Sequence, residues 1–269
     1  MIDIHSHILP GVDDGSKSMA ETIEIVRQLQ EAGFKTIIAT PHVLEGKDYL
    51  RSADIRAITD QVRFQVAAAE IQVKILPGAE NYIFPDMAKW ARDGKLMTLG
   101  DAGKYLLVEL PLLEIPHYTD QVFFELQVLG LTPVLAHPER YKGLVEEPER
   151  VLDWAKKGIL LQLDLRSLSG KYGPQAKGLA KRLLGSDLIH FMGSDAHRVS
   201  QREGAYGEEL RSVQGIVGEK KFGEMTLLNP QRMLEGEVVQ RIGEYCLMGV
   251  GREKKGKRGF WSRISKILC

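Results

Sequence analysis

The sequence predicts an α/β fold in which a parallel sheet curls into a distorted barrel of seven or eight strands. Seven short apolar segments alternate with segments of helical periodicity, which is typical of parallel sheets. Six of these seven segments carry His, Asp or Glu at or just beyond their carboxyl ends. A TIM-like barrel brings all strand ends to one face, whereas the ends of an open sheet form a line, so we favour the barrel.

Apolar periodicity and turn residues define the elements in order. The first helix has a capping box, in which Ser18 caps the Glu21 amide and the Glu21 side chain reaches back, and Gly33 closes this helix. The predicted strands are 2–5, 35–40, 73–76, 105–109, 132–137, 159–164 and 188–197. The predicted helices are 19–33, 52–70, 86–93, 119–129, 148–157, 174–185, 202–217 and 229–236.

Composition argues against nucleic-acid-binding, disulfide-rich, secreted and membrane-spanning proteins. Lys+Arg and Asp+Glu balance at 36 each, so nothing global indicates nucleic-acid binding. The two cysteines, Cys246 and Cys269, exclude a disulfide framework and fit a reducing cytoplasm. No signal-peptide pattern opens the chain, and no apolar run approaches the roughly 20 residues that span a bilayer. We therefore expect a cytoplasmic protein.

Histidines and carboxylates at the strand ends indicate a metal site. His5 and His7 lie two residues apart on an extended chain, so both imidazoles point to the same side. His with Asp or Glu and without Cys is the ligand chemistry of zinc, manganese and iron hydrolases. Nine ligands exceed what one ion can use, so two or three ions are expected. The candidate ligands are His5, His7, Asp14, His42, Glu80, Glu109, His137, Asp195 and His197.

Single members of this set have simpler explanations. Glu109 could be an ordinary ion-paired carboxylate, and Asp14 could cap a turn. His190 falls inside an apolar strand, so we expect a buried core residue and not a ligand. His117 lies in a loop after a strand end, and the sequence leaves its relation to the site open.

Five motifs carry a resemblance to a known family over residues 1 to about 235. The motifs are IHSHILPGVDDG (4–15), ATPH (39–42), LPGAE (76–80), AHPER (136–140) and GSDAH (193–197). They resemble the polymerase-and-histidinol-phosphatase (PHP) superfamily, and within it the manganese-dependent bacterial tyrosine phosphatases of the CpsB/YwqE type, which are encoded with capsule or exopolysaccharide genes.

The resemblance implies a PHP fold and a trinuclear site, with Glu80 bridging two ions. Manganese is the implied metal, although iron, zinc, cobalt or magnesium also suits such ligands. The implied groups are His5, His7, Glu80 and Asp195; Glu80, Glu109 and His137; and Asp14, His42 and His197.

The resemblance also implies catalytic roles. Arg140 and Arg202 correspond to arginines that hold the phosphate, although each could be a solvated surface residue. Protonation of the leaving oxygen by Asp14, Asp195 or a water is left open. No Cys-x5-Arg loop is present, which excludes the thiol-based phosphatase mechanism.

One strand end departs from the family pattern. Asp164 and Arg166 add an acid and a base where relatives tend to have small polar residues. These two side chains could shape the substrate mouth, but we expect them to pair with each other.

We expect a phosphatase barrel over residues 1–240 and a basic, amphipathic tail over 241–269. Residues 252–269 combine seven Lys or Arg with one acid and an apolar face that includes Phe260 and Trp261. This pattern is typical of a peripheral membrane contact at the inner face of the cell membrane, or of a docking peptide, and its alternative is a solvated tail.

The expected function is metal-dependent hydrolysis of phosphotyrosine in proteins. The implied substrate is a membrane-associated bacterial tyrosine kinase that regulates capsular or exopolysaccharide synthesis. One alternative is a small-molecule phosphomonoesterase, such as a histidinol-phosphate phosphatase. Another is a module that binds phosphotyrosine or the kinase without turnover, and the complete set of nine ligands argues against it.

Overall fold

The computed structural model describes residues 1–46, 49–202 and 204–239 of the chain, and its centre is a parallel sheet. One group of strands is ordered β1-β2-β4, and a second is ordered β3-β5-β6-β7-β8-β9. The strands are β1 (Ile2–Ser6), β2 (Thr36–Ala39), β3 (His42–Val43), β4 (Lys74–Pro77), β5 (Glu80–Tyr82), β6 (Tyr105–Glu109), β7 (Thr132–Ala136), β8 (Leu160–Asp164) and β9 (Phe191–Gly193).

Two of the predicted strands are interrupted where their ligands begin. The segment predicted at 35–40 continues past Pro41 as β3, and the segment at 73–76 continues past Gly78 as β5. Proline donates no backbone hydrogen bond, so the ladder breaks there and resumes with new partners. β3 then pairs with β5 so that His42 lies directly beside Glu80 in the register.

The sheet curls until its last strand lies beside its first. The Asp195 amide donates to the His5 carbonyl at 2.8 Å, and the His7 amide donates to the Ala196 carbonyl at 2.9 Å. Ser6 and Ala196 form a parallel bridge. The carboxyl ends of β1 and β9, which are far apart in the sequence, therefore meet at one place.

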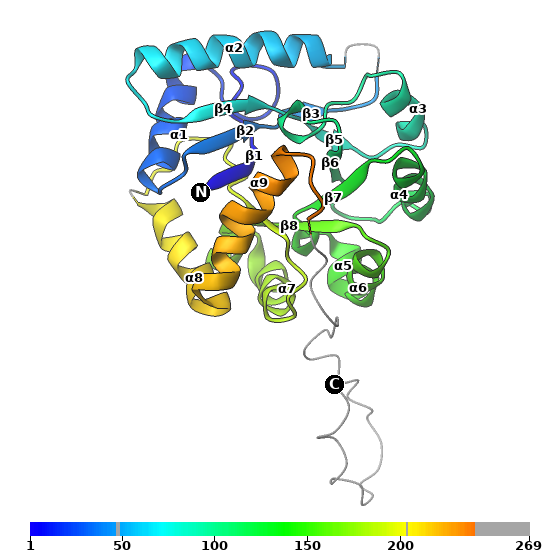
Figure 1. Ribbon diagram of the computed structural model, residues 1–269. Coiled ribbons are helices and arrows are strands. Elements are labelled where there is room, and N and C mark those ends of the chain that lie inside the picture. Colours follow the sequence, from blue (N-terminus) through cyan, green and yellow to red (C-terminus); the bar gives the residue numbers. More distant parts are fainter. Residues whose placement is uncertain (47–48, 203, 240–269) are drawn as a thin grey trace, which may run out of the picture.

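Helices surround the sheet on its outside (Figure 1). Each predicted helix is present, with α8 extending to Gly223 and a short additional helix, α5, after β7. The helices are α1 (Met19–Glu31), α2 (Ser52–Ala68), α3 (Met87–Arg92), α4 (Thr119–Val128), α5 (Lys142–Glu146), α6 (Glu149–Lys156), α7 (Gly173–Gly185), α8 (Ala205–Gly223) and α9 (Asn229–Leu234).

The capping box of α1 is half confirmed. Ser18 Oγ accepts from the Glu21 amide at 3.2 Å, as predicted. The Glu21 carboxylate, however, accepts from the Lys17 amide at 2.8 Å and not from Ser18. Lys17 precedes the cap by one residue, so the carboxylate satisfies a donor just outside the helix.

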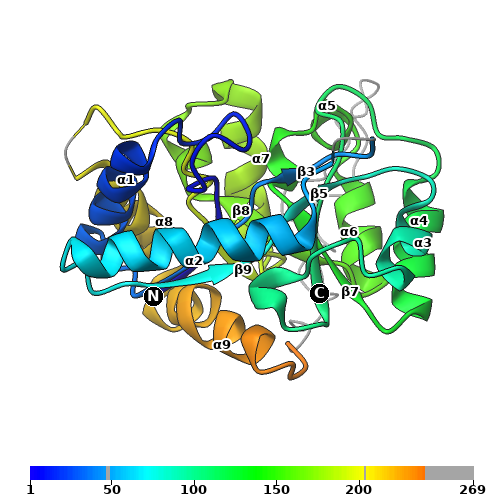
Figure 2. The ribbon, with the colours of Figure 1, turned by 90° about the horizontal axis from the view of Figure 1, so that it is seen from above.

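The apolar residues form two clusters, one on each side of the sheet. The larger lies between the strands and the helices. The smaller is enclosed by the curled sheet and combines inward-facing residues such as Ile4 and Leu107 with Met233 of α9 and Val239. In Figure 2, α9 lies on one side of the strands, and the loop after β1 lies on the opposite side with β3 and β5. Apolar packing thus fills one end of the sheet and leaves the other for polar residues.

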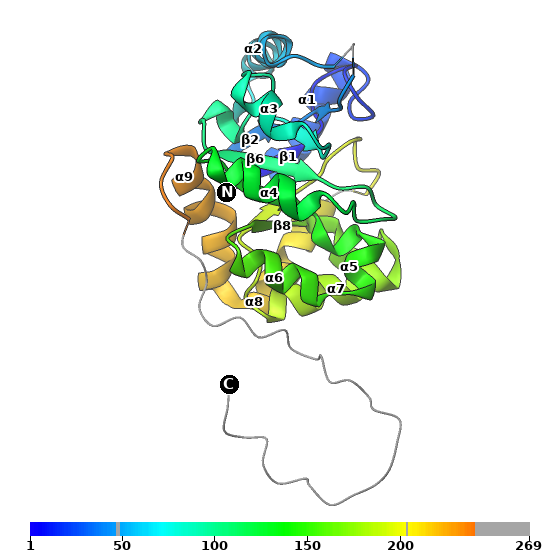
Figure 3. The ribbon, with the colours of Figure 1, turned by 90° about the vertical axis from the view of Figure 1, so that its right-hand side faces the viewer.

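The third view shows the same division, with α9 at one end of the strands and the yellow loop after β9 at the other (Figure 3). No helix within the described residues is long and apolar enough to cross a membrane. The predicted tail at 241–269 lies outside the residues that the structure describes.

Candidate metal centre

The nine predicted ligands come together at the carboxyl ends of the strands. Three groups of potential ligand atoms each lie within 4.8 Å of one another, and the groups share members. The groups are His5, His7 and Glu80; His42, Glu80 and Glu109; and His7, Asp14, His42 and His197.

The most buried group is formed by β1 together with β5 and the end of β9. Glu80 Oε2 lies 3.2 Å from His5 Nε2 and 3.3 Å from His7 Nε2. Asp195 Oδ1 lies 3.4 Å and 3.3 Å from the same two nitrogens. These four side chains are the predicted first group, and they surround a single point.

Glu80 also faces the second group. Its Oε2 lies 3.1 Å from His42 Nδ1, and its Oε1 lies 3.0 Å from His137 Nε2. Glu109 approaches the same two rings, at 3.4 Å from His42 and 3.8 Å from His137. The position of Glu80 between both groups is the geometry that a bridging carboxylate needs.

The third group is the most open to solvent. Asp14 Oδ1 lies 3.5 Å from His42 Nε2 and 3.3 Å from His197 Nε2. The Asp14 side chain is 69% exposed, whereas the Glu80 side chain is 1% exposed. Of the nine residues, Asp14 therefore borders the mouth of the site, and Glu80 lies at its floor.

Hydrogen bonds orient three of the imidazoles with Nε2 toward the cluster. His5 Nδ1 lies 2.9 Å from Gln162 Oε1, and His7 Nδ1 lies 2.8 Å from Asp13 Oδ2. His197 Nδ1 lies 2.9 Å from the Asp195 carbonyl. All three partners are acceptors, so each Nδ1 carries the proton and each Nε2 presents a lone pair, as in metal-ligating histidines.

This arrangement fits bound cations. His5 Nε2 and His7 Nε2 are 3.1 Å apart, and both lie 3.2–3.4 Å from the Glu80 and Asp195 carboxylates, so one cation could bind all four groups. His137 Nδ1 is buried and has no hydrogen-bond partner among the described residues. Nitrogen and carboxylate donors without sulfur suit manganese, iron or zinc.

Burial and neighbouring charges shift the pKa values of the cluster. Burial lowers the pKa of His5, but the Glu80 and Asp195 carboxylates outweigh this effect and raise that pKa to about 9. Burial raises the pKa of Glu109, and the charge of Glu80 adds to this effect, so that it reaches about 9. Without a cation these groups hold protons at neutral pH, and metal binding would displace those protons.

Two ligands sit on strained backbone. His137 has a φ of 29° and Asp195 a φ of 47°, both in the left-handed region that non-glycine residues rarely adopt. His137 directly follows β7, and Asp195 lies two residues beyond the end of β9. Such strain is concentrated at functional sites.

Two glycines allow the close packing behind the histidines. A Cβ on Gly15 would lie 2.2 Å from the His7 carbonyl oxygen, and a Cβ on Gly193 would lie 2.6 Å from His5 Cβ. Any side chain at either position would push the first strand out of place. The backbone therefore approaches both ligands because these two residues are glycine.

Arg140 lies at the cluster, as predicted. Its Nη1 donates to Asp195 Oδ2 at 2.6 Å, and its guanidinium stacks over the Tyr172 ring at 4.3 Å. Arg202 is 60% exposed and pairs with Glu208 at 2.9 Å, on the wall of an adjoining pocket. The structure thus brings Arg140, and not Arg202, into contact with the ligands.

Asp164 and Arg166 pair with each other, as expected, with Nε and Oδ1 3.6 Å apart. Arg166 does more, because its Nη2 donates to the Asp195 carbonyl and lies 3.5 Å from Asp195 Oδ2. His190 is fully buried, and its Nδ1 accepts from the Leu161 amide at 3.2 Å, which confirms a core role. His117 is exposed and packs edge-on against Tyr118.

Several residues that support the ligands were not predicted from the sequence. Asp13 and Gln162 orient ligand imidazoles, and Asp3 accepts from both the Ser194 amide and its hydroxyl. Glu139 is buried and accepts from the Asp164 amide at 2.9 Å. Asp13 stands beside Asp14 in the sequence and could have been found there, whereas Gln162 has no local signal.

The fold and the site together define a class of protein: metal-dependent enzymes whose histidine and carboxylate ligands converge at the carboxyl ends of curled parallel strands. Residues 1–235 match the family described as capsular polysaccharide synthesis, CpsB/CapC. The chain belongs to this family.

Relatives agree with that assignment. Tyrosine-protein phosphatase YwqE of Bacillus subtilis is 37% identical over 245 residues, which cover 90% of this chain and 94% of the relative. Tyrosine-protein phosphatase CpsB of Streptococcus pneumoniae is 29% identical and covers 89% of this chain, over its own full length.

Solved structures match as well. A structure from work on YwqE and CpsB, described as unique metal-dependent tyrosine phosphatases, superposes with a TM-score of 0.84 at 36% identity, over 90% of this chain and 97% of that one. The histidinol phosphate phosphatase of Lactococcus lactis, solved with zinc, superposes with a TM-score of 0.52 at 15% identity, over 84% of this chain and 95% of that one. The second likeness concerns the fold alone.

Proposed function

We propose that this chain is a metal-dependent phosphatase that hydrolyses phosphotyrosine in proteins. The observation that carries the proposal is the convergence of nine histidine and carboxylate ligands beside Arg140, in a chain of the CpsB/CapC family. The curled sheet serves as the distorted PHP barrel that positions them, and residues 1–240 form the phosphatase unit.

The nine residues hold two or three cations, for which manganese is our preferred metal. Bound cations would stabilise the charge that develops on phosphoryl oxygens and would lower the pKa of water. His5, His7, Glu80 and Asp195 form the inner position, and Asp14, His42 and His197 the outer one. His137 and Glu109 complete a position between them, with Glu80 shared.

The arginines orient the phosphate. The guanidinium of Arg140 is fixed by stacking on Tyr172, so its remaining donors can form a fork with two phosphate oxygens. Arg202 stands further out, and we assign it a role in guiding the phosphate or the peptide toward the mouth. In this arrangement the scissile phosphate enters from the side on which Asp14 is exposed.

Asp14 is the better candidate to protonate the departing tyrosine oxygen. Burial raises the pKa of Asp195, but His5 and His7 outweigh this effect. The pKa of Asp195 therefore lies well below the usual range, and the carboxylate remains a hydrogen-bond acceptor. Asp14 is exposed at the mouth, where a leaving group would depart. A phenol has an ordinary pKa near 10, so little acid assistance is needed.

The proposed substrate is a membrane-associated bacterial tyrosine kinase that controls capsular or exopolysaccharide synthesis. The family description, which names capsular polysaccharide synthesis, supports this assignment. Residues 252–269 would add a peripheral contact at the inner face of the membrane, on the basis of their basic charge and the apolar residues among them.

Turnover of two substrates tests the proposal. Metal-loaded protein is given a phosphotyrosyl peptide and histidinol phosphate at equal concentrations, and phosphate release is measured. We expect a much larger kcat/KM for the peptide. A preference for histidinol phosphate would move the function to small-molecule phosphomonoesters, and no turnover of either would favour a binding module.

A further inference from the structure

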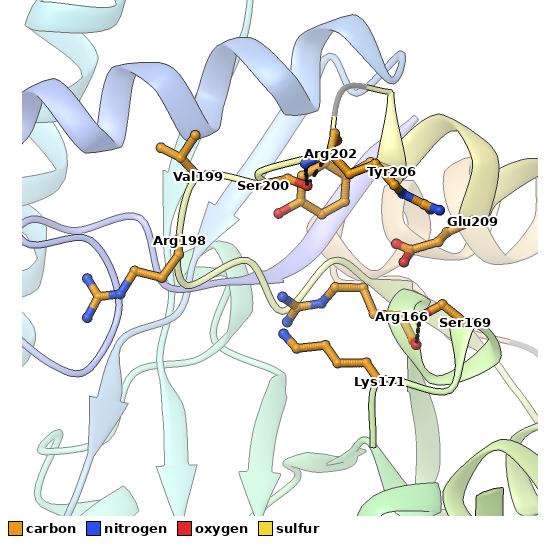
Figure 4. A pocket seen from close by; sticks show the side chains of 9 residues that line it. All are labelled: Arg166, Ser169, Lys171, Arg198, Val199, Ser200, Arg202, Tyr206 and Glu209. Atoms are coloured by element: carbon orange, nitrogen blue, oxygen red, sulfur yellow. Dashed lines mark hydrogen bonds between the residues drawn. The ribbon is translucent and has the colours of Figure 1, made fainter. Parts of the chain in front are cut away.

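A basic pocket of about 400 Å³ adjoins the metal centre (Figure 4). Four cationic side chains line it, namely Arg166, Lys171, Arg198 and Arg202, against a single carboxylate, Glu209. Its walls come from the segment after β8 and from the loop between β9 and α8. Nothing in the nine-ligand cluster requires this concentration of positive charge.

The pocket and the metal centre share a wall. Arg166 lines the pocket and also donates to the carbonyl of Asp195, which is one of the nine ligands. Arg198 directly follows His197 in the chain and donates to the Gly15 carbonyl at 2.5 Å. A group in the pocket is therefore a near neighbour of a group at the cluster.

Two of the four cations are already held by acids outside the pocket. Arg198 Nη1 lies 3.4 Å from Glu21 Oε2, and Arg202 Nη2 lies 2.9 Å from Glu208 Oε2. Both interactions draw the positive charge away from the centre of the pocket. Arg198 and Arg202 therefore add to the positive electrostatic potential of the pocket more than they contact a bound anion directly.

The other two cations, Arg166 and Lys171, lie side by side, and only Arg166 has carboxylate partners among the described residues. Figure 4 shows the Lys171 ammonium next to the Arg166 guanidinium. Arg166 pairs with Asp164 and Asp195, whereas within the described part of the chain no carboxylate forms an ion pair with Lys171. Burial lowers the pKa of Lys171, and the charge of Arg166 lowers it further. Like charges held together in this way favour an anion between them.

Glu209, the carboxylate that lines the pocket, does not balance the charge of Lys171. Glu209 is 8% exposed. Burial raises its pKa above the ordinary value for a glutamic acid, although Arg166 acts in the opposite direction. The figure places its carboxylate on the opposite side of the pocket from the Lys171 ammonium.

We infer that Arg166 and Lys171 form a second anion subsite, which binds an acidic or phosphorylated side chain of the substrate near the scissile phosphotyrosine. This inference rests on the proposed phosphotyrosine hydrolysis. An extended peptide advances roughly 3.3–3.6 Å per residue, so a side chain a few positions from the phosphotyrosine reaches an adjoining pocket. The protein thus selects phosphotyrosines in anionic sequence contexts.

A peptide series tests this inference. The parent phosphotyrosyl peptide has neutral neighbours. Its variants carry one glutamate or one phosphoserine at one, two or three positions on either side. We expect kcat/KM to rise roughly 1.5-fold to fivefold at the favoured position, the size of effect that exposed charge pairs produce. A larger gain with phosphoserine than with glutamate would identify a phosphate as the preferred anion.

Charge variants locate the effect. Lys171→Gln is expected to reduce the ratio of kcat/KM between the anionic and neutral peptides, mainly through KM, and Lys171→Glu is expected to reduce it further. Lys181→Gln, an exposed lysine on α7, is the matched control and should keep the wild-type ratio.

The outcomes distinguish a failure of the anion subsite from a failure of the proposed phosphatase function. If wild type cleaves all the peptides equally, or if Lys171→Glu keeps the full preference, the second subsite is wrong while the phosphatase function stands. If no phosphotyrosyl peptide is cleaved but another phosphomonoester is, the proposed function fails, and the subsite inference fails with it.

Discussion

An imidazole binds a metal through one nitrogen only if its other nitrogen is held in the right protonation state. His7 meets this condition because its Nδ1 lies 2.8 Å from Asp13 Oδ2. The same carboxylate accepts from the amides of Gly15 and His42. At the scale of single residues, Asp13 thus controls the metal centre without itself belonging to a ligand group.

We predict that Asp13→Asn weakens metal binding by about 10- to 100-fold, because an amide cannot fix the His7 tautomer as a carboxylate does. Competition with a metal chelator measures the affinity directly. Asp93→Asn, at an exposed carboxylate beyond α3, is the control and should bind metal as wild type does. Equal affinity of the Asp13 variant and wild type would contradict this role.

Arg140 offers a second test at this scale. We predict that Arg140→Lys lowers kcat/KM for an aryl phosphate by roughly 100-fold, because an ammonium loses both the fork and the stacking on Tyr172. Arg150→Lys is a matched control, since Arg150 also stacks on an aromatic ring, that of Trp154, away from the site. The role would be wrong if both variants kept wild-type rates.

Individual residues also show what the sequence could predict. Eight of the nine ligands were identifiable because they fall at strand ends with recognisable chemistry, and Asp14 because it closely follows the two histidines in the first motif. Gln162 was not, because an amide within an apolar strand resembles any buried polar residue until His5 is seen beside it. The second contact of Arg166, with Asp195, depends on how two distant loops pack and has no local pattern.

At the scale of elements, the broken strands place the ligands. β3 and β5 resume after Pro41 and Gly78 with His42 and Glu80 in register, so neighbouring strands about 4.8 Å apart hold two ligands side by side. Periodicity predicted each strand as far as its break. The register beyond the break follows from tertiary packing, which the sequence does not encode locally.

Gly193 tests the contact between β9 and β1. We predict that Gly193→Ala destabilises the fold by about 1–3 kcal/mol, because its Cβ would overlap His5 Cβ and the Gln162 side chain. Gly178→Ala, in the middle of α7 with open space around its Cβ, should instead stabilise the protein by about 0.5–1 kcal/mol. Denaturant unfolding measures both changes, and a destabilised Gly178 variant or an unaffected Gly193 variant would contradict the packing argument.

At the scale of the whole molecule, the two ends of the curled sheet have opposite characters. Apolar residues and α9 close one end, where Met233 and Val239 pack against the inner strands. Buried histidines and carboxylates fill the other end, where they pair with one another. Cations bound by these ligands would stabilise the folded state as well as support catalysis.

Metal removal tests this link between the site and stability. At a free metal concentration about 100 times the dissociation constant, binding stabilises the folded state by about 2.7 kcal/mol. For a chain of this size we therefore predict that chelation lowers Tm by roughly 5–10 °C. Calorimetry with and without a chelator measures the shift. An unchanged Tm would show that the cluster folds equally well without cations.

The central claim is that the convergent cluster is a metal centre that hydrolyses phosphotyrosine. Its most direct test is a manganese titration of chelator-stripped protein, in which bound metal and phosphate release from a phosphotyrosyl peptide are followed together. We predict no turnover in the stripped protein and full turnover once two or three ions are bound per chain. A His42→Ala variant should lose both metal binding and turnover. Undiminished turnover by the stripped protein would contradict the central claim.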